Sequence, residues 1–147
     1  MPIGLRRDPY IGYNFIVEID GIINAGFTEV SGLSMETVFD TITEGGVNDY
    51  EHKLPRGIKY SNITLKRGLV DCELWLWYQS IVRGEIKRKN GTIFLLDHSG
   101  IPVFAWCFFD VFPIKWEGPT LNAASNTVAT ETLVLAHQGL IEIGSYF

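Results

Sequence analysis

The stretch from Val103 to Phe112 is predicted to form a β-strand with two apolar faces. Alternate residues of a strand point to opposite sides. One side carries Val103, Ala105, Cys107, Phe109 and Val111, and the other carries Phe104, Trp106, Phe108 and Phe112. A strand in a small antiparallel sheet usually keeps one face in water. This strand must therefore be covered twice, by the core of its own domain and by a helix, a second sheet or another subunit.

Most of the remaining chain also shows the alternation of β-strands. Residues 13–19 alternate cleanly, and Asp20-Gly21 then supplies a turn, so we expect a β-hairpin here. Its second arm is a bent or bulged strand from about Phe27 to Thr43. Further strands are predicted over residues 58–69 and, as the last strand of the domain, over 127–139. These patterns together indicate a mainly β protein.

A single helix is predicted, at about residues 71–83. Asp71 is the expected N-cap and Gly84 the expected residue after the C-terminus. The apolar residues at helical spacing are Leu74, Trp77, Tyr78 and Ile81. Tight turns are expected at Asn90-Gly91 and at residues 97–100, on either side of another strand. We therefore expect one domain, residues 1–147, in which the helix lies on a sheet.

Residues 44–57 have no strand or helix periodicity. The segment EGGVNDYEHKLPRG contains three glycines, one proline and charges of both signs. It is predicted to be a long loop or a protruding hairpin. A connection of this length in a small domain is usually functional or docked on another surface, because an unsupported loop loses conformational entropy without return.

Composition and charge exclude several classes of protein. The net charge of -5 and the pI of about 5.1 argue against a protein built to grip nucleic acid. No apolar run approaches the roughly 20 residues of a membrane span or resembles a signal peptide, so we expect synthesis in the cytoplasm. Cys72 and Cys107 are too few for a disulfide framework or a metal site, and both are expected to be small buried apolar residues.

The sequence shows no pattern of catalytic, cofactor-binding or metal-ligating residues. His52, His98 and His137 each lack a second ligand at nearby spacing, and a metal site needs three or four convergent ligands. No serine lies in a nucleophile elbow, and the glycine pairs match neither a phosphate-binding loop nor a dinucleotide fingerprint. We therefore expect no enzyme, no metal and no cofactor.

Six segments, in a fixed order, carry a resemblance to a known family. They are YNFIVEIDG, AGFTEVSGLSMET, EGG, LPRGIKYSNITLKRGL, WYQSIVRGEIKRKNGTIFLLD and FFDVFPIKWEGPTLNAASNTVATETLVLAHQGL. Together they resemble the tail-tube proteins of contractile phage tails and of phage-tail-like contractile injection systems, over about residues 10 to 140. This chain has Pro55-Arg56-Gly57 where a shorter Pro-Gly is common, a departure that affects only the local turn.

The resemblance implies a fold, an assembly and a set of partners. The implied fold is two packed antiparallel sheets forming a β-barrel or sandwich with one helix, similar to the type VI secretion tube protein. The implied assembly is hexameric rings stacked into a hollow inner tube within a contractile sheath. Partners would be other copies of the chain, the sheath protein, baseplate or initiator and cap proteins, and an effector or DNA as cargo in the lumen. The protein would then be part of a phage tail or a tail-like particle.

On this resemblance, two segments are expected at subunit or ring interfaces. The loop 44–57 would reach a neighbouring subunit or the next ring; a mobile loop in solvent is the alternative. The small-residue connector from Pro119 to Thr127 would permit close approach and hydrogen bonding. The candidate interface residues are Glu44, Val47, Asp49, Tyr50, His52, Leu54, Arg56, Asn122 and Asn126.

Three other functions stay open from the sequence. The first is a tube-initiator ring at the baseplate, which shares the fold and differs in its partner below. The second is a small-ligand-binding β-barrel, which predicts a monomer with an internal apolar cavity. The third is a hydrolase hidden in the barrel, which predicts loss of an activity when His137 or Cys107 is changed.

Overall fold

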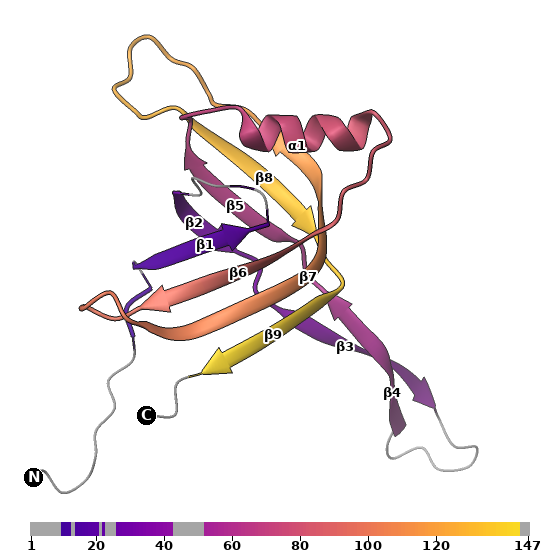
Figure 1. Ribbon diagram of the computed structural model, residues 1–147. Coiled ribbons are helices and arrows are strands. Elements are labelled where there is room, and N and C mark those ends of the chain that lie inside the picture. The colour runs from indigo at the N-terminus through magenta and orange to yellow at the C-terminus, as the bar shows by residue number, and fades with distance from the viewer. Residues whose placement is uncertain (1–9, 13, 21, 23–25, 43–51, 145–147) are drawn as a thin grey trace, which may run out of the picture.

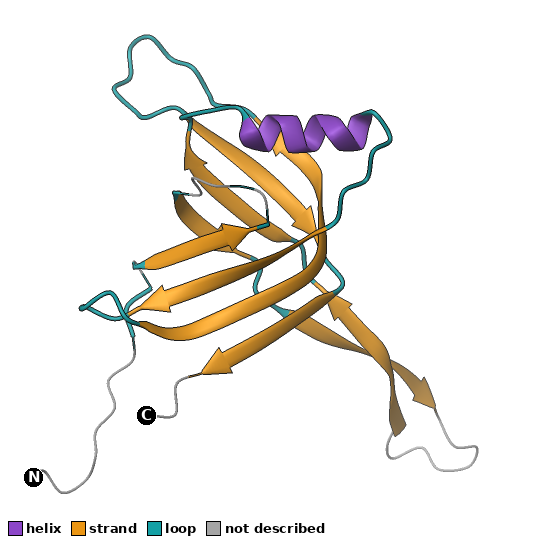
Figure 2. Ribbon diagram, in the orientation of Figure 1, coloured by secondary structure: helices purple, strands orange, loops and turns teal. Residues whose placement is uncertain are grey.

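The computed structural model describes residues 10–12, 14–20, 22, 26–42 and 52–144, and shows two packed antiparallel sheets with one helix (Figures 1 and 2). The elements are β1 Phe15–Ile19, β2 Phe27–Ser31, β3 Met35–Ile42, β4 His52–Tyr60, β5 Ile63–Gly68, α1 Glu73–Val82, β6 Lys89–Leu96, β7 Pro102–Glu117, β8 Thr130–Ala136 and β9 Gly139–Gly144. Sheet A has the order β1-β6-β7-β9, and sheet B has the order β7-β8-β5-β2. The described strands do not close into a barrel, so the predicted two-sheet fold is confirmed in its sandwich form.

The long strand β7 belongs to both sheets. Its first half pairs with β6 and β9, and its second half pairs with β8. Asp110, between the halves, has a φ of 53°, a left-handed conformation that is uncommon for a residue other than glycine. Because the alternation changes phase here, Phe108 and Val111 both lie fully buried in the core. Simple alternation puts these two residues on opposite faces, and that prediction is wrong.

The core lies between the two sheets and under α1. Burial of this apolar surface is the main favourable term for folding, at about 25 cal/mol per Å². The buried apolar residues that form one cluster are Val17, Ile19, Ile22, Phe27, Ile63, Leu65, Leu74, Trp77, Ile93, Phe108, Val111, Leu133 and Leu135. The first half of β7 thus has one face on this core. No helix or second sheet covers its other face, which is the outer face of sheet A in the described structure.

The predicted N-terminal hairpin does not form. β1 pairs with β6, with Val17 opposite Ile93, and β2 pairs with β5, so the two strands lie in different sheets (Figure 1). The alternation over residues 15–19 is nevertheless correct, because Val17 and Ile19 are buried. The turn predicted at Asp20 is nevertheless present, because the N–H of Ile22 donates to the carbonyl oxygen of Ile19 at 3.0 Å. Only the pairing of the two arms is wrong, since each arm pairs with a strand distant in the sequence.

Two predicted long strands that pair with each other are interrupted at neighbouring positions. The predicted strand over 27–43 splits into β2 and β3 at Gly32, and the predicted strand over 58–69 splits into β4 and β5 at Ser61 and Asn62. Gly32 has a φ of 90°, and a Cβ atom there would lie 2.0 Å from the carbonyl oxygen of Asn62. Only glycine fits such a position. Beyond this kink β3 and β4 leave the sandwich as a separate two-stranded sheet (Figure 1).

Helix α1 is confirmed, and it covers the sandwich at the upper end in Figure 1. Leu74 and Trp77 face the core as predicted. The N-cap position is Cys72 rather than Asp71, but the carboxylate of Asp71 still accepts a hydrogen bond from the backbone N–H of Glu73 at 3.0 Å. Gly84 follows the helix with a φ of 83°, as expected of the residue that ends it.

The predicted turns and strands of the C-terminal half are confirmed only in part. The turn at residues 97–100 is confirmed, with the Asp97 carboxylate accepting from the N–H of Ser99 at 2.8 Å. The turn at Asn90-Gly91 is wrong, because both residues belong to β6 and Gly91 makes room for the ring of Phe108. β8 is confirmed but is not the last strand, since β9 follows it and pairs with β7.

Candidate assembly surfaces

The hairpin of β3 and β4 is the most protruding described part of the molecule (Figure 1). Among the described strands, β3 and β4 pair only with each other. An isolated two-stranded hairpin is marginally stable in water. Two polar contacts support it: Arg56 donates to Asp40 at 3.3 Å, and the ammonium of Lys53 lies 5.2 Å from the ring centre of Phe39. Both are exposed contacts, which contribute little.

The hairpin exposes large apolar side chains on both faces. The exposed ones are Met35, Phe39, Ile42, Leu54 and Ile58. Register places Phe39 and Ile58 on one face, and Ile42 and Leu54 on the other. Large apolar side chains exposed on both faces of a protruding hairpin indicate a contact with another protein.

The predicted interface residues of this region divide into two groups. His52, Leu54 and Arg56 lie on β4, so residues 52–57 form a bulged strand of a protruding hairpin, the second of the two forms predicted for residues 44–57, and not a loop. Glu44, Val47, Asp49 and Tyr50 lie outside the described residues. The structure therefore turns part of the predicted loop into a protruding hairpin, which the sequence had left as the second possibility.

The predicted connector Pro119 to Thr127 forms an exposed loop between β7 and β8, at the opposite end of the molecule from the hairpin (Figure 1). Asn122 stabilises its own loop, because its side-chain oxygen accepts from the N–H of Ala124 at 3.0 Å. Asn126 is exposed. The structure thus does not bring the asparagines together with the hairpin, and the two regions are separate surfaces.

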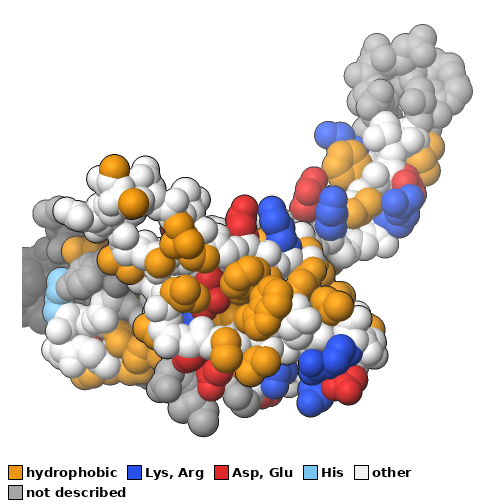
Figure 3. All heavy atoms as spheres, turned by 90° about the horizontal axis from the view of Figure 1, so that it is seen from above, with side chains coloured by type: hydrophobic (Ala, Val, Ile, Leu, Met, Phe, Trp, Pro, Cys, Tyr) orange, Lys and Arg blue, Asp and Glu red, His pale blue; other side chains and the backbone are white. Residues whose placement is uncertain are grey.

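A third surface lies at the upper end, over α1. The helix carries apolar residues on its outward side as well as on its core side, and the adjoining loops add more. Figure 3 shows apolar side chains gathered on this end of the molecule. The exposed apolar residues of α1 and these loops are Leu69, Val70, Trp75, Leu76, Val82, Ile86, Leu121 and Val128. A helix that is apolar all round is normally buried, so this surface is suited to a protein partner.

A fourth surface is the outer face of sheet A. Register aligns Ile16, Phe94, Ala105 and Ile143 in one cross-strand row, and Glu18, Thr92, Cys107 and Ile141 in the next. Ile16, Ile141 and Ile143 are each about half exposed. The apolar second face predicted for Val103 to Phe112 is therefore real, and within the described chain it remains open.

Beneath α1 lies a buried ionic cluster that the sequence analysis missed. The guanidinium of Arg67 on β5 donates to Glu131 on β8 at 2.7 Å and also to Asp71 before α1. The indole N–H of Trp116 donates to the other Glu131 oxygen at 3.1 Å. Arg67 and Glu131 are both 1% exposed. The cluster joins β5, β7, β8 and the start of α1, and so fixes the helix on the sheet.

One signal in the sequence does point to this cluster. Glu131 falls in the alternating set with Leu133, Leu135 and His137, which is the core face of β8. A charge on an apolar face implies a buried partner, since an unpaired buried charge is very costly. Sequence alone did not show which of the 12 basic residues supplies that partner.

The pKa of the Asp71 carboxyl is lowered from its usual value of 3.8, mainly by the hydrogen bond from the backbone of Glu73 and further by Arg67, against an opposing effect of burial. A carboxyl whose pKa is lower in the folded state stabilises the fold above its unfolded pKa. That contribution is lost as the pH falls through the folded pKa.

We therefore expect Asp71→Asn to reduce the free energy of unfolding at neutral pH. The difference between this variant and the wild type should shrink as the pH falls below the unfolded value near 3.8. Urea unfolding between pH 7 and pH 2.5 measures it. Glu85→Gln, at an exposed carboxylate after α1, is the control for the loss of a surface charge. A difference that stays constant down to the lowest pH would contradict this role of Asp71.

His137 and Cys107, the two residues named for a hidden hydrolase, lie apart in the structure, on the core face of β8 and on the outer face of sheet A. The two ring nitrogens of His137 lie 2.9 Å from the carbonyl oxygen of Ser61 and 3.1 Å from that of Gly139. Cys107 lies on the outer face of sheet A, half-buried, and Cys72 is exposed, so the expectation that both cysteines are buried is wrong for Cys72. Among the described residues, no group of three or more His, Cys, Asp or Glu could hold a metal ion.

Unpaired strand edges and exposed apolar surfaces are features of a structural protein that assembles with other protein chains. The described residues include no helix with the length and apolar character that crossing a membrane requires. The chain belongs to the family of the T4-like virus tail tube protein gp19, whose model matches residues 12–141. The predicted resemblance is thus confirmed, and the family supports a structural role in a tail tube.

Solved structures of contractile injection systems are similar over nearly the whole chain. A chain of the anti-feeding prophage (AFP) baseplate, 6-fold symmetrised, is 28% identical with a TM-score of 0.86, covering 97% of this chain and 100% of that chain. A chain of the sheath-tube complex of the extracellular contractile injection system PVC in its extended state is 29% identical with a TM-score of 0.83, covering 92% of each chain.

A more distant likeness concerns the fold alone. A type six secretion system protein has a TM-score of 0.60 at 11% identity, covering 88% of this chain and 82% of that chain. The predicted relation in fold to a type VI secretion protein is therefore confirmed. No curated protein sequence matches this chain at a significant level.

Proposed function

We propose that this chain forms hexameric rings that stack into the hollow inner tube of a contractile tail or injection machine. The tube is a rigid conduit, and contraction of the sheath propels it together with its cargo. The observation that carries this proposal is the family match over residues 12–141. It is joined by the two edges of sheet B, which are unpaired among the described residues. The similar AFP baseplate chain comes from a 6-fold symmetrised structure, which supports a ring of six.

The strand edges of sheet B suit a closed ring. Among the described residues, β2 pairs only with β5, and the second half of β7 pairs only with β8. All pairings in this sheet are antiparallel and it has four strands, so its two edge strands run in opposite directions. β2 of one copy can therefore continue the antiparallel order with β7 of the next. When two different edges meet head to tail, each copy is rotated relative to the one before it. The copies form a ring if this rotation brings the last copy back to the first.

The apolar surfaces supply the contacts that make the rings rigid. The hairpin and the surface over α1 lie at opposite ends of the molecule (Figure 1), so they suit contacts between stacked rings. Of the candidate interface residues, His52, Leu54 and Arg56 would act from the hairpin, and Asn122 and Asn126 from the loop before β8. A tube that moves as one body needs many cooperative contacts, each of more than roughly 1,000 Å² in total.

The partners follow from this assembly. The similar PVC chain comes from a sheath-tube complex, which supports a sheath protein around the tube formed by this chain. Baseplate or initiator and cap proteins would meet its two ends, and an effector or DNA would be the cargo. The protein would be made in the cytoplasm and act within a phage tail or a tail-like particle.

A tube-initiator ring at the baseplate is the second candidate. The likeness to an AFP baseplate chain, over all of that chain, favours it. An initiator occurs as one ring per particle and a tube protein as many, so the copy number in purified particles separates the two. Quantitative mass spectrometry against the sheath protein gives that number: near-equal copies indicate the tube, and a large excess of sheath indicates the initiator.

The edge pairing is tested by Ile114→Lys. Ile114 lies in the second half of β7 at a bulge and is 41% exposed. A lysine on an edge strand opposes pairing with another chain, while a surface change alters the free energy of unfolding by less than about 0.5 kcal/mol. We expect a folded monomer without rings or tubes, as measured by light scattering and negative-stain microscopy.

Ile101→Lys is the matched control, because Ile101 is equally apolar, exposed and placed in the turn before β7. This variant should assemble like the wild type. If Ile114→Lys also formed rings at wild-type concentration, the β7 edge would have no part in the assembly. If the wild type formed no rings even with sheath and baseplate proteins present, the proposed function itself would be wrong.

A further inference from the structure

The segment from the end of α1 to the start of β6 holds the densest group of cations in the chain. Arg83, Lys87, Arg88 and Lys89 stand against a single carboxylate, Glu85, on a chain whose net charge is -5. Among the described residues, none of these four cations forms an ion pair with a carboxylate. Like charges this close together repel each other, so an anionic group that binds among them is favourable.

Three of these cations line an open groove of about 390 Å³ beside α1, which we call the basic groove. They are Arg83, Lys87 and Lys89. Figure 3 shows Lys and Arg side chains gathered at the margin of the apolar surface over α1. The segment is held on the sandwich, because the indole N–H of Trp77 donates to the carbonyl oxygen of Lys87 at 3.3 Å and the ammonium of Lys89 lies 5.9 Å from the centre of that indole. This support lowers the entropy cost of binding.

The rest of the basic groove is largely apolar. Ile22 and Trp77 line it and are nearly buried, while Leu76 is 53% exposed and can contact a further apolar side chain. Glu73 is the one carboxylate among the described residues that line it. A ligand that fills this groove therefore carries an apolar group together with anionic groups.

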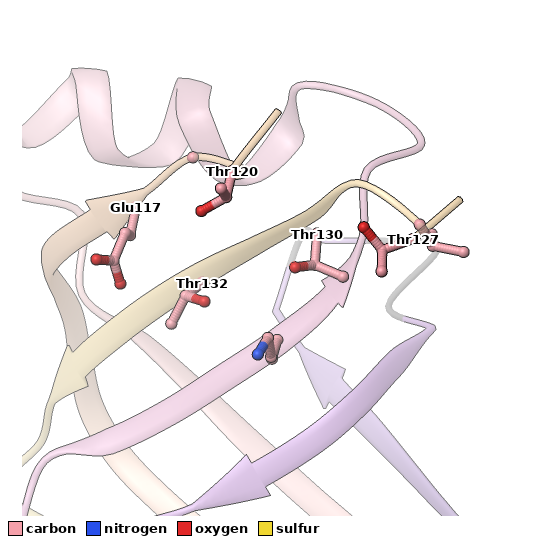
Figure 4. A pocket seen from close by; sticks show the side chains of 8 residues that line it. Glu117, Thr120, Thr127, Thr130 and Thr132 are labelled. Atoms are coloured by element: carbon pink, nitrogen blue, oxygen red, sulfur yellow. The ribbon is translucent and has the colours of Figure 1, made fainter. Parts of the chain in front are cut away.

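A second open hollow, on the outer face of sheet B, has a different chemistry. Figure 4 shows Thr130 and Thr132 from β8 beside Glu117 from β7. Lys66 lines this hollow too, so one cation and one carboxylate balance among hydroxyl groups. Of these two hollows, the basic groove is the one that selects an anionic ligand.

An acidic protein segment fits the basic groove better than phosphate or nucleic acid. A free phosphate would contact the cations and leave Ile22 and Leu76 uncovered. Nucleic acid requires a surplus of cations along a whole face, and this chain is acidic overall. An apolar side chain flanked by carboxylates satisfies both parts of the groove at once.

The described hairpin of another copy does not supply such a segment. Its carboxylates already lie beside cations, since Glu36 is opposite Lys59 and Asp40 accepts from Arg56 at 3.3 Å. The sheath protein is the other neighbour along the whole length of a tube, and the similar PVC chain comes from a sheath-tube complex. The groove also lies apart from the edges of sheet B that the proposed ring uses.

We propose that the basic groove binds an acidic segment of the sheath protein. An apolar side chain of that segment packs on Ile22 and Leu76, and its carboxylates bind Arg83, Lys87 and Lys89. This inference rests on the proposed function and assigns the residues of each subunit that hold the sheath. Because the contact is charged and at the surface, it weakens as the salt concentration rises.

Zero-length cross-linking of intact tubes with their sheath identifies the occupant. A carbodiimide joins a lysine amine to a carboxylate that touches it, and mass spectrometry of the digested product names both residues. We expect links from Lys87 or Lys89 to an aspartate or glutamate of the sheath protein. Links from these lysines to another copy of this chain, or none while other lysines of the tube do react, would overturn the assignment.

A charge reversal in the groove tests its contribution to binding. Tubes of Lys87→Glu, first shown to be intact by microscopy, are sedimented with purified sheath protein at increasing concentration. We expect sheath binding at least about tenfold weaker than for the wild type, since like charges then face each other. Lys87→Arg, which keeps the charge, should bind as the wild type does.

Lys115→Glu is the matched control, because it makes the same change of charge at an exposed lysine of β7. Wild-type sheath binding by Lys87→Glu tubes, or an equal loss for Lys115→Glu, would contradict a specific role of the groove. Either result leaves the tubes, and so the proposed function, intact. Failure of the wild type to form tubes would instead count against the proposed function, and the cross-links of intact particles test the groove even if Lys87→Glu does not assemble.

Discussion

Replacing Glu131 by alanine is expected to lower the free energy of unfolding by about 3–5 kcal/mol, because it leaves the charge of Arg67 buried without its main carboxylate. Arg67 is 1% exposed and donates to Glu131 at 2.7 Å. The substitution also takes the hydrogen-bond acceptor from the indole of Trp116. This loss is a large fraction of the stability of an ordinary domain. Urea unfolding followed by tryptophan fluorescence measures it.

Two further variants separate the charge effect from a general effect of mutation. Glu117→Ala removes an exposed glutamate from the neighbouring strand and should change the free energy of unfolding by less than about 0.5 kcal/mol. Removing both partners, with Arg67→Met and Glu131→Leu together, should recover most of the loss, since a buried ion pair can often be replaced by apolar residues. Equal small losses for Glu131→Ala and Glu117→Ala would show that the cluster does not hold the fold together.

The second large effect concerns assembly rather than folding. Phe39→Lys combined with Ile58→Lys puts two charges on one face of the protruding hairpin, where both residues are about half exposed. Burying two unpaired ammonium groups in an interface is very unfavourable. We expect the loss of stacked tubes at every protein concentration, as seen by negative-stain microscopy, with an unchanged midpoint of thermal unfolding for the monomer.

The control for this variant keeps the charge but moves it to the sandwich. Ile101→Lys combined with Ile11→Lys changes two exposed apolar residues that lie outside both the hairpin and the surface over α1. If it abolished tubes as completely as the hairpin variant, the effect would not be specific to the hairpin. Tubes of normal length from the Phe39→Lys, Ile58→Lys chain would remove that hairpin face from the assembly.

Local patterns in the sequence were sufficient for the class of fold. The alternation of Val17 and Ile19, the helical spacing of Leu74 and Trp77, and Gly84 after the helix depend on neighbours within one turn or one strand. Such signals survive in any tertiary context that buries one face. The two apolar faces of Val103 to Phe112 likewise indicated a second cover, by a helix, a second sheet or another subunit. The family resemblance is confirmed.

The tertiary structure decided what the local patterns left open. β1 and β2 look like the two arms of one hairpin, but each pairs with a strand distant in the sequence, because pairing depends on which apolar faces meet in the core. Gly32 breaks a long strand only because Asn62 approaches it from the opposite arm. Arg67 and Glu131 are 64 residues apart and meet only when β5 pairs with β8.

The candidate interface residues show the same division. Sequence identified the protruding region and the loop before β8 as exposed and without chemistry, and His52, Leu54, Arg56 and Asn122 do lie there. It did not show that residues 52–57 form a strand, nor which sheet face is polar. Composition and periodicity are properties of short segments and therefore indicated the strands and the helix, while the resemblance of six segments in a fixed order indicated the family. The pairing of strands determined the edges, the buried cluster and the faces of the two sheets, since these exist only where distant segments meet.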